Sequence, residues 1–509
     1  MSPKRAHDYT SELPSALYTA QQTRELDRIA IEEQGIAGFE LMSRAGRAAF
    51  ELLKARWPGV RKIQVFCGGG NNGGDGYIIA SLAKLEGMDV SLVQMSDPAS
   101  LKGDALLAFG QAQADQVAMS PFSAEVAIDA EVVVDAMLGT GLTGEVRDPY
   151  ASAIRLIESA GVPVLAIDIP SGLCADTGRS LGATLPAQAS ITFIGMKQGL
   201  LTGSAPRFCG QLFFADLGVP GAVYEKLPIA AQRFQAERIQ SLLPPRAKDA
   251  HKGQFGHVLV IGGDQGMGGA VAMTAEAAGR CGAGLVSVIT WPEHVPAILA
   301  RRPECMVLGY DEGCSIDFAI EKASVIVAGP GIGRARWGAF LLEQALAATV
   351  PIVLDADGLN YLAALAEQSP QAARRGNWIL TPHPGEAARL LGTDNAEIQR
   401  DRFAAVTELC DRFAGTLLLK GAGTLIKSPG QPTCITTTGN PGMATGGMGD
   451  VLSGVIGALV AQGLSLHDAA TVGAWVHGAA ADRAAAMHGE RGLLATDLMV
   501  FLQELVNAR

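Results

Sequence analysis

The sequence predicts two α/β domains, each with a mostly parallel sheet covered by helices on both faces. Length is the first observation, because 509 residues exceed what one hydrophobic core normally serves. The second is the order of elements, since short apolar runs alternate with helical stretches in both halves of the chain. The third is glycine: many of the 62 glycines lie where a strand would turn into a helix, and backbone amides can approach a phosphate there.

The N-terminal half is expected to begin with two amphipathic helices and to continue with strands. Between Thr19 and Leu53 the apolar residues recur at helical spacing, and the pattern breaks at Gln34-Gly35. A glycine loop and a helix over residues 77–85 are expected directly after the first strand. The strand-like runs in this half are residues 63–67, 90–95, 132–135, 164–168 and 190–194.

A change in composition marks the boundary between the two domains. Residues 217–252 contain four prolines and mixed charge and show no strand signal, so the junction is predicted near Leu227. The expected domains are therefore residues 1–226 and 227–509. Alternation then restarts, with strand-like runs at residues 257–261, 285–290, 325–328, 352–355, 378–381 and 416–420.

Charge and composition exclude several classes of partner. The net charge is −11 and no segment is rich in Lys and Arg, which argues against nucleic acid or an anionic membrane as the main partner. The least polar long segment, residues 451–466, is too short and too rich in glycine for a good membrane span. No apolar leader follows Lys4 and Arg5, and the eight cysteines are scattered without a CxxC pair. We therefore expect a soluble cytoplasmic protein with reduced thiols.

The first strand of the N-terminal half leads into a glycine loop with polar side chains. Residues 68–76 (GGGNNGGDG) fit the pattern G-x-G-x-x-G, and Asp97 follows at about the distance expected in a dinucleotide fold. This match alone is weak, because strand-to-helix turns use glycine routinely. Asn71, Asn72 and Asp75 are more informative, since polar side chains in a crowded glycine loop suit recognition rather than packing.

Two further strand ends in this half carry an aspartate. Asp135 precedes GTGL and Asp168 precedes PSG. A helix cap or a loop hydrogen-bond acceptor is the alternative role for each aspartate taken alone, and the recurrence at several strand ends argues against it. Ligands of parallel sheets bind beyond the carboxyl ends of the strands, so we expect the three strand ends to form one crevice.

These motifs resemble the N-terminal domain of the NAD(P)H-hydrate epimerases over about residues 17–225. The resemblance rests on NNGGDG (71–76), DAMLGTGL (135–142) and DIPSG (168–172), which are highly specific in this order. It implies a Rossmann-like domain that inverts the hydroxyl-bearing C6 carbon of a hydrated nicotinamide.

The same resemblance assigns roles to individual positions. A potassium ion would be held by Asn72, Asp135 and Ser171, whose oxygen atoms suit a hard cation. Asp168 would contact the substrate and carry the acid–base step. The other implied substrate contacts are Asn71, Asn72, Gly73, Gly74, Asp75, Gly139, Thr140, Gly141, Leu142, Thr143, Gly144 and Glu145.

The strongest motif of the C-terminal half is GGMGD at residues 446–450, which opens an apolar helix over residues 451–460. Successive glycine amides at a helix start form a positive nest for a phosphoryl group, and Asp450 beside them is placed to accept a hydroxyl proton. A plain helix cap by Asp450 is the alternative, but it leaves the run of glycines unexplained.

Two other strand ends of this half have suitable residues. KGAGT at residues 420–424 follows a strand and is placed to enclose a nucleotide phosphate. TPHPGE at residues 381–386 puts His383 at a crevice and Glu386 in the first turn of a helix. A lone histidine such as His383 is more often structural. The P-loop pattern is absent.

Residues 235–506 resemble the ribokinase-like family, specifically its ADP/ATP-dependent NAD(P)H-hydrate dehydratase branch. The motifs are KGQFGHVLVIGG (252–263), GPGIG (329–333), DADGLN (355–360), TPHPGE (381–386), KGAGT (420–424) and GNPGMATGGMGDVLSG (439–454). The resemblance implies hydrate contacts at Ala270, Gly331, His383 and Asp450, with Asp450 as the catalytic base. It implies nucleotide contacts at Lys420, Gly421, Ala422, Gly423, Thr424 and Gly449.

Together the two resemblances imply a bifunctional repair enzyme for NAD(P)H-hydrate. The first domain would interconvert the two C6 epimers, and the second would dehydrate the S epimer. ADP is expected as co-substrate by analogy, with Mg²⁺, and we expect a homo-oligomer.

Three alternatives remain open from the sequence. A small-molecule kinase would share the GxGD helix and would form a stable phosphorylated product. The N-terminal half would be a non-catalytic binding module if it were like the mRNA-decapping scaffold proteins that reuse this fold. A nicotinamide-dependent dehydrogenase would use the loop that begins at Gly68.

Overall fold

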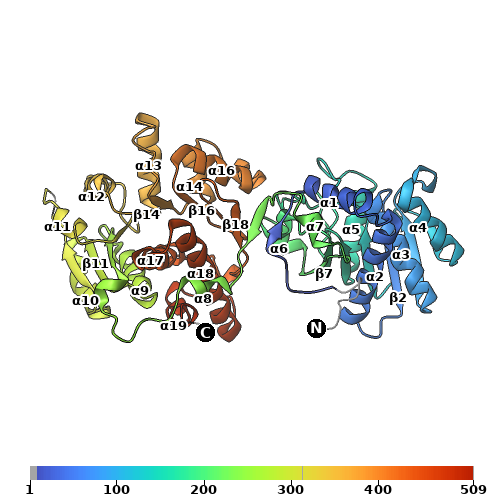
Figure 1. The fold of residues 1–509 in the computed structure, drawn as a ribbon, viewed down its shortest axis with the longest axis horizontal. Helices are drawn as coiled ribbons and strands as arrows, with labels where there is room; N and C mark the ends of the chain where they lie inside the picture. Colours follow the sequence, from blue (N-terminus) through green and yellow to red (C-terminus); the bar gives the residue numbers. More distant parts are fainter. Residues whose placement is uncertain (1–8, 312, 508–509) are drawn as a thin grey trace. The chain divides into compact units, whose positions relative to one another are not determined.

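The structure, a computed structural model, describes residues 9–311 and 313–507 of the chain (Figure 1). Its contacts divide the chain into two units, with the border between Gln232 and Arg233, a few residues after the predicted junction. Lys4 and Arg5, on which the expectation of no leader peptide rests, lie outside the described residues. In the part of the chain that is described, no helix is both long and apolar enough to cross a bilayer.

The N-terminal unit is built on a parallel sheet with the strand order β4-β3-β2-β5-β6-β7-β8. From β2 the chain moves outward to β3 and β4, and from β5 it moves the other way to β8. The order therefore reverses between β2 and β5, where α/β sheets form ligand crevices. The elements are β1 (Ala16–Leu17), α1 (Ala20–Glu32), α2 (Gly38–Arg56), β2 (Lys62–Cys67), α3 (Asn71–Leu85), β3 (Asp89–Gln94), α4 (Gly103–Ala114), β4 (Ala118–Pro121), β5 (Val132–Ala136), α5 (Tyr150–Ala160), β6 (Val164–Ile167), β7 (Ala189–Phe193), α6 (Ala205–Phe208), β8 (Gln211–Ala215), α7 (Gly221–Tyr224) and β9 (Ala231–Arg233).

Side chains alternate between two cores along the strands of this sheet. In β5, Val132 and Val134 pack with apolar residues of α2, α3 and α4, whereas Val133 packs with those of α5 on the other face. Because both faces are covered, the strands are apolar throughout rather than alternately polar. The N-terminal unit thus has the three α/β/α layers that the sequence predicts.

The C-terminal unit contains a second sheet, with the strand order β18-β17-β16-β15-β14-β13-β10-β11-β12. The strands from β16 to β12 are parallel, and β17 and β18 are antiparallel additions at one end. The elements are α8 (Arg238–Leu242), β10 (His257–Ile261), α9 (Gly268–Arg280), β11 (Leu285–Thr290), α10 (Val295–Arg301), β12 (Met306–Gly309), α11 (Asp317–Ile320), β13 (Val325–Ala328), α12 (Arg336–Ala347), β14 (Ile352–Leu354), α13 (Asp357–Gln368), β15 (Trp378–Leu380), α14 (Pro384–Leu391), α15 (Asn395–Arg400), α16 (Arg402–Phe413), β16 (Thr416–Leu419), β17 (Thr424–Lys427), β18 (Thr433–Thr436), α17 (Met448–Ala461), α18 (Leu466–His488) and α19 (Leu498–Leu505).

Helices α9 and α17 pack closely against each other on one face of this sheet. At Gly454 of α17 a Cβ would overlap the carbonyl oxygen of Thr274 in α9, so the two backbones touch there. The hydroxyl of Thr274 also donates a 3.0 Å hydrogen bond to the carbonyl oxygen of Asp450. The first turns of α9 and α17 are therefore fixed relative to each other.

The predicted α/β class is confirmed, and the strands predicted at 257–261, 285–290 and 325–328 coincide with β10, β11 and β13. Two predictions about elements were wrong. The helix after the glycine loop begins at Asn71 rather than Tyr77, so NNGGDG forms its first turns. Residues 217–252 contain β9, a three-residue strand that pairs with β1 and is too short to leave a pattern in the sequence.

Candidate active sites

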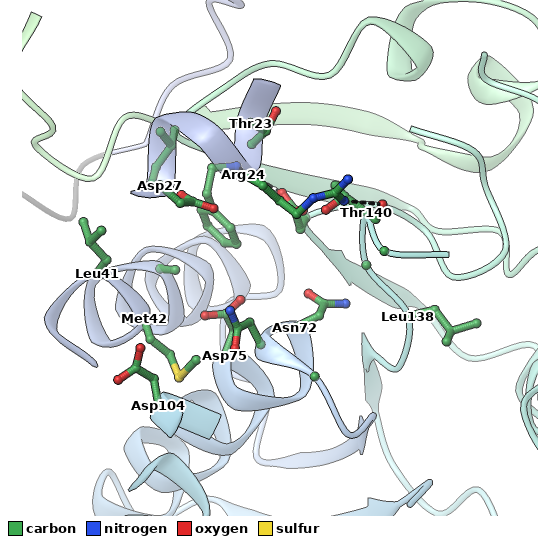
Figure 2. A pocket seen from close by; sticks show the side chains of 18 of the residues that line it. Thr23, Arg24, Asp27, Leu41, Met42, Asn72, Asp75, Asp104, Leu138 and Thr140 are labelled. Carbon is green, nitrogen blue, oxygen red and sulfur yellow. Dashed lines mark hydrogen bonds between the residues drawn. The ribbon is translucent and has the colours of Figure 1, made fainter. Parts of the chain in front are cut away.

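A cavity of about 720 Å³ opens in the N-terminal unit beyond the carboxyl ends of β2, β5 and β6 (Figure 2). Helices α1, α2 and α3 form its other walls. Figure 2 shows Thr23, Arg24 and Asp27 of α1 on one side of the pocket and Asn72 and Asp75 of α3 on the other. The predicted residues that line it are Asn71, Asn72, Asp75, Gly139, Thr140, Gly141, Leu142, Thr143 and Asp168.

The other predicted residues of this site do not line the cavity. Gly144 and Glu145 are exposed just beyond the lining loop. Gly73 and Gly74 are buried, and packing explains their lack of a side chain. A Cβ on Gly73 would overlap the carbonyl oxygen of Gly68, and a Cβ on Gly74 would come 2.5 Å from the Cε of Met42. These glycines let the start of α3 approach the end of β2 and the side of α2.

Asp168 forms an ion pair with Lys197 at the base of the pocket. Lys197 is almost fully buried, and its ammonium also donates hydrogen bonds to Thr192 Oγ1 (2.9 Å) and to the carbonyl oxygen of Phe193 (3.2 Å). Asp168 accepts a further bond of 3.1 Å from Thr192 and adopts a positive φ of 66°. A non-glycine residue in this conformation is costly and is found preferentially at functional sites.

Asp135 and Ser171 lie together beneath the pocket and are fully buried. Ser171 donates to Asp135 through its hydroxyl (2.6 Å) and through its backbone N–H (2.8 Å). Burial raises the pKa of Asp135 to about 6, although these hydrogen bonds oppose the shift.

The side chain of Asn72 lies beside Gly139 and is buried at its tip. Within the described residues, neither its oxygen nor its nitrogen has a hydrogen-bond partner. Buried amide groups without a partner are rare and call for an explanation. An oxygen-binding cation would supply one for the amide oxygen, because carboxylate, hydroxyl and amide oxygens are the donors that a hard ion prefers. The three predicted potassium ligands therefore fit the ion chemically.

In the C-terminal unit, Asp450 lies in the first turn of α17, which begins after the left-handed Gly447. The helix cap is Gly447, so Asp450 is free for other contacts. Burial raises the pKa of Asp450 to about 6, and the negative charge of Asp355 adds to this, while Lys420 opposes it. A carboxyl group with this pKa is suited to proton transfer near neutral pH.

Lys420, which is partly buried, and Asp355, which is fully buried, form an ion pair of 2.7 Å beside Asp450. Ser453 of α17 donates a 2.7 Å hydrogen bond to the other oxygen of Asp355. Burial favours the neutral form of Asp355, but Lys420 and the hydrogen bonds outweigh it, so its pKa lies below the usual value. A Cβ on Gly449 would lie 3.2 Å from Lys420 Nζ, so the Gly449 backbone lies next to this ion pair.

The loop of residues 420–424 is held from behind by Arg402. This guanidinium is buried and donates hydrogen bonds of 3.3 Å to the carbonyl oxygens of Lys420 and Gly423. Gly421 has a positive φ of 136°, and a Cβ there would meet the guanidinium at 2.8 Å. Gly421 and Ala422 are exposed, and Thr424 begins β17.

His383 caps the N-terminus of α14. Its Nδ1 accepts hydrogen bonds from the backbone N–H groups of Gly385 (3.0 Å) and Glu386 (3.3 Å), and burial lowers its pKa. His383 therefore has a structural role as a helix cap, which was the alternative considered for it from the sequence. Burial raises the pKa of Glu386 to about 7, against the effect of Lys420.

Ala270 and Gly331 lie next to each other. A Cβ on Gly331, which has a positive φ, would come 3.1 Å from the Cβ of Ala270. Thr274 bonds to the carbonyl oxygens of both Ala270 and Asp450, each at 3.0 Å. The structure thus brings these positions towards the start of α17.

Comparison with known proteins decides the family. A family model described as NAD(P)H-hydrate dehydratase matches residues 258–504, and one described as YjeF-related protein N-terminus matches residues 38–199. A bifunctional NAD(P)H-hydrate repair enzyme of Coxiella burnetii is 50% identical over 493 residues, which cover 97% of this chain and all of that protein. The one from Escherichia coli K12 is 43% identical and covers 97% of this chain and 95% of its own.

The chain belongs to the bifunctional NAD(P)H-hydrate repair enzymes. It combines an epimerase domain with a dehydratase domain. A crystal structure of a ribokinase-like protein from Enterococcus faecalis aligns with a TM-score of 0.50 and 29% identity, covering 54% of this chain and 95% of that one. The predicted ribokinase-like fold of the second domain is confirmed by this likeness.

Several site residues of this repair enzyme were missed from the sequence. Lys197 and Arg402 are single basic residues far along the chain from their partners, and Asp27 lies in an ordinary amphipathic helix. Asp355 begins the quoted motif DADGLN but had no role assigned. Its position directly after a strand, like that of Asp168, was the available signal.

Proposed function

We propose that the N-terminal unit interconverts the R and S epimers of NAD(P)H-hydrate at C6, and that Asp168 transfers the proton. Asp168 carries this proposal because it combines a strained backbone, a buried lysine partner and a place in the pocket wall. The lining residues of the motifs at 71–75 and 139–143, with Asp168, would contact the substrate. Gly73 and Gly74 would act by letting the backbone of α3 approach the end of β2 and the side of α2.

The C-terminal unit is proposed to dehydrate the S epimer with ADP, which gives AMP and phosphate. Hydroxide is a poor leaving group. Transfer of the terminal phosphoryl group of ADP to the C6 hydroxyl replaces it with phosphate, whose departure with a neighbouring proton restores the reduced nicotinamide. Asp450 would accept the hydroxyl proton, and the N–H groups at the start of α17 would stabilise the transferring group.

The support for these roles is the meeting of Asp450, Lys420 and Asp355 at one helix start. Lys420, Gly421, Ala422, Gly423, Thr424 and Gly449 would hold the nucleotide, and Ala270, Gly331 and His383 would contact the hydrate. Lys420 is placed to neutralise phosphate charge once nucleotide displaces part of its pairing with Asp355.

Two cations belong to the proposal. Asn72, Asp135 and Ser171 would hold potassium, whose charge would help to anchor an anionic substrate. The described residues contain no group of three or more His, Cys, Asp or Glu side chains able to hold a metal ion. We therefore propose that Mg²⁺ enters with the nucleotide phosphates.

Cellular context is part of the same proposal. A cytoplasmic site is supported by the eight cysteines, all of which are free thiols. Homo-oligomerisation remains a prediction, which light scattering of the purified protein would check.

The test follows absorbance at 340 nm after the protein is added to both NADPH-hydrate epimers with K⁺, Mg²⁺ and ADP or ATP. Nearly complete recovery of NADPH is expected. Asp450→Ala should abolish recovery, and Asp168→Ala should limit it to the S epimer's share plus slow spontaneous conversion. Absence of nucleotide-dependent recovery from either epimer would overturn the proposal and favour a small-molecule kinase.

A further inference from the structure

Asp27 lines the epimerase pocket although it belongs to none of the three motifs (Figure 2). It lies on α1, which begins with a capping box at Thr19 and whose first N–H group, that of Ala20, donates a 2.6 Å hydrogen bond to the carboxylate of Asp176. These contacts fix the helix start, so the Asp27 side chain faces the cavity from a defined position. Figure 2 shows its carboxylate and that of Asp75 directed into the space between α1 and α3.

The pocket holds three interacting carboxyl groups and one nearby ammonium. Asp168 contacts Lys197 directly, whereas Asp27 and Asp75 form no ion pair among the described residues. Burial raises the pKa of Asp27 to about 6, with a further contribution from Asp168, although Lys197 opposes it. Burial also raises the pKa of Asp75 well above its usual value, and the charges of Asp168 and Asp27 add to this. Carboxyl groups that interact in this way hold a proton at higher pH than an ordinary aspartate does.

The reaction needs a proton donor as well as an acceptor. At C6 the bond to oxygen must break on one face of the ring and form again on the other. The C6 hydroxyl group leaves readily only after it has been protonated, and the water that enters must lose a proton. The Asp168–Lys197 ion pair supplies the acceptor, but a carboxylate paired with an ammonium has no proton to give.

We propose that Asp27 is the second catalytic acid–base residue of the epimerase pocket and works with Asp168 from a different wall. The assignment rests on the proposed epimerase function. Asp27 gives its proton to the C6 hydroxyl while the C6–O bond breaks, and the bonding pair leaves with the water formed. The lone pair of the ring nitrogen then makes a double bond to C6.

Water next adds to C6 from the other face, and the nitrogen recovers its electron pair. Asp168 accepts the proton that this water loses. Exchange with solvent returns one proton to Asp27 and removes one from Asp168, so turnover needs no other reactant. The opposite conversion retraces these steps from the state that the forward turnover leaves, in which Asp168 has just received a proton and Asp27 has given one up.

The variant Asp27→Asn tests this in the full-length protein with potassium, ADP and Mg²⁺. The rate of NADPH recovery from the R epimer, after the spontaneous rate is subtracted, should fall by roughly 10²- to 10⁴-fold. This is the usual loss for an acid–base group. ADP-dependent recovery from the S epimer, which uses only the other unit, should be unchanged and reports a folded protein. Asp27→Glu should restore part of the rate, because it keeps a carboxyl group.

Glu25→Gln is the matched control, since it removes the same charge from α1 at a residue outside the pocket. If the wild type converts the R epimer and Asp27→Asn does so equally fast, the inference is overturned while the proposed function stands. If the wild type itself does not convert the R epimer, the proposed function fails first.

The pH profile separates an acid from a residue that only shapes the pocket. Protonated Asp27 is needed for R conversion, so wild-type kcat/KM should fall as pH rises through the pKa near 6. The groups that face Asp27 are Asp75 on α3, Asp168 and Lys197 beyond the strands, Tyr224 on α7, and Arg24 on its own helix. The alkaline fall should vanish in Asp27→Asn. An unchanged profile with a raised KM would show that Asp27 only shapes the pocket.

Discussion

In each unit of this enzyme a lysine and an aspartate of the site form an ion pair. The pairing determines which carboxyl groups of the site are held in place as carboxylates and which can carry a proton. Lys197 fixes Asp168 in one unit, and Lys420 fixes Asp355 in the other. In each unit a second carboxyl group, Asp27 or Asp450, remains outside the pair and has a raised pKa. Such contrasts between neighbouring titratable groups are typical of acid–base sites.

Replacement of the buried lysine tests the first pair. Lys197→Met should lower kcat for R epimer conversion by roughly 10²-fold, because Asp168 loses the group that orients it. The full-length variant should keep ADP-dependent recovery from the S epimer at 340 nm. Lys226→Met, which removes an exposed lysine paired with Glu33, is the control and should change neither rate. Equal epimerase kcat in both variants would contradict a role for Lys197.

The raised pKa of Asp450 predicts a pH dependence for dehydration. Only the ionised carboxylate accepts a proton, so kcat/KM for the S epimer should fall as pH decreases through about 6, approaching tenfold per unit at lower pH. Initial rates between pH 5 and 8 on freshly prepared S epimer would measure this.

The same shift has a consequence for stability. A carboxyl group whose pKa is higher in the folded than in the unfolded chain binds more protons when folded, so its contribution to stability falls as pH rises through that interval. Asp450→Asn should therefore lose dehydratase activity while being at least as stable as the wild type at pH 8. A marked loss of thermal stability of this variant at pH 8 would argue that the surroundings of Asp450 do not disfavour its charged form.

At the scale of elements, close backbone approaches place the sites. The start of α3 lies against the end of β2 because Gly73 has no side chain. Gly454 does the same for α17 and α9. Since Asn72 and Asp75 lie in the first turns of α3 and Asp450 in that of α17, helix position and site geometry are linked.

The variant Gly73→Ala tests this link. Its Cβ would overlap the Gly68 carbonyl oxygen, so the free energy of unfolding of the N-terminal unit should fall by about 1–3 kcal/mol. Urea denaturation followed by circular dichroism would measure the change. At Gly70, where a Cβ meets nothing within 4 Å, alanine should cost far less. Similar losses at both positions would show that overlap is not the cause.

Arg402 should matter for nucleotide binding through the loop it supports. Arg402→Met removes its hydrogen bonds to the carbonyl oxygens of Lys420 and Gly423, so the loop should lose its fixed shape. The KM for ADP should rise several-fold more than the KM for the hydrate. Steady-state kinetics at varied ADP would measure both constants, with Arg400→Met, an exposed neighbour, as control. A proportional rise of both constants would instead indicate general destabilisation.

At the scale of the whole molecule, each proposed site is built from residues of one unit only. An Asp168→Ala protein and an Asp450→Ala protein, mixed in equal amounts, should therefore recover nearly all NADPH from both epimers. Epimer released from one protein reaches the other by diffusion. The mixture is followed at 340 nm beside each variant alone. Failure of two variants that are each active in their intact unit would show that the two sites must belong to one molecule.

The sequence alone determined the two-domain α/β architecture, the positions of most strands along the chain and the three motifs at each set of strand ends. These features follow from local patterns, because apolar periodicity and glycine turns involve residues that are close together in the sequence. The family resemblance added the expected roles of Asp168 and Asp450.

Only the tertiary structure decided which distant charges meet. Lys197 lies 29 residues from Asp168, and Lys420 lies 65 residues from Asp355, so no local pattern connects the partners. The raised pKa values of Asp27, Asp75 and Asp450 likewise depend on burial and on these neighbours. Electrostatic free energy depends on distance and desolvation in space, which the folded chain alone defines.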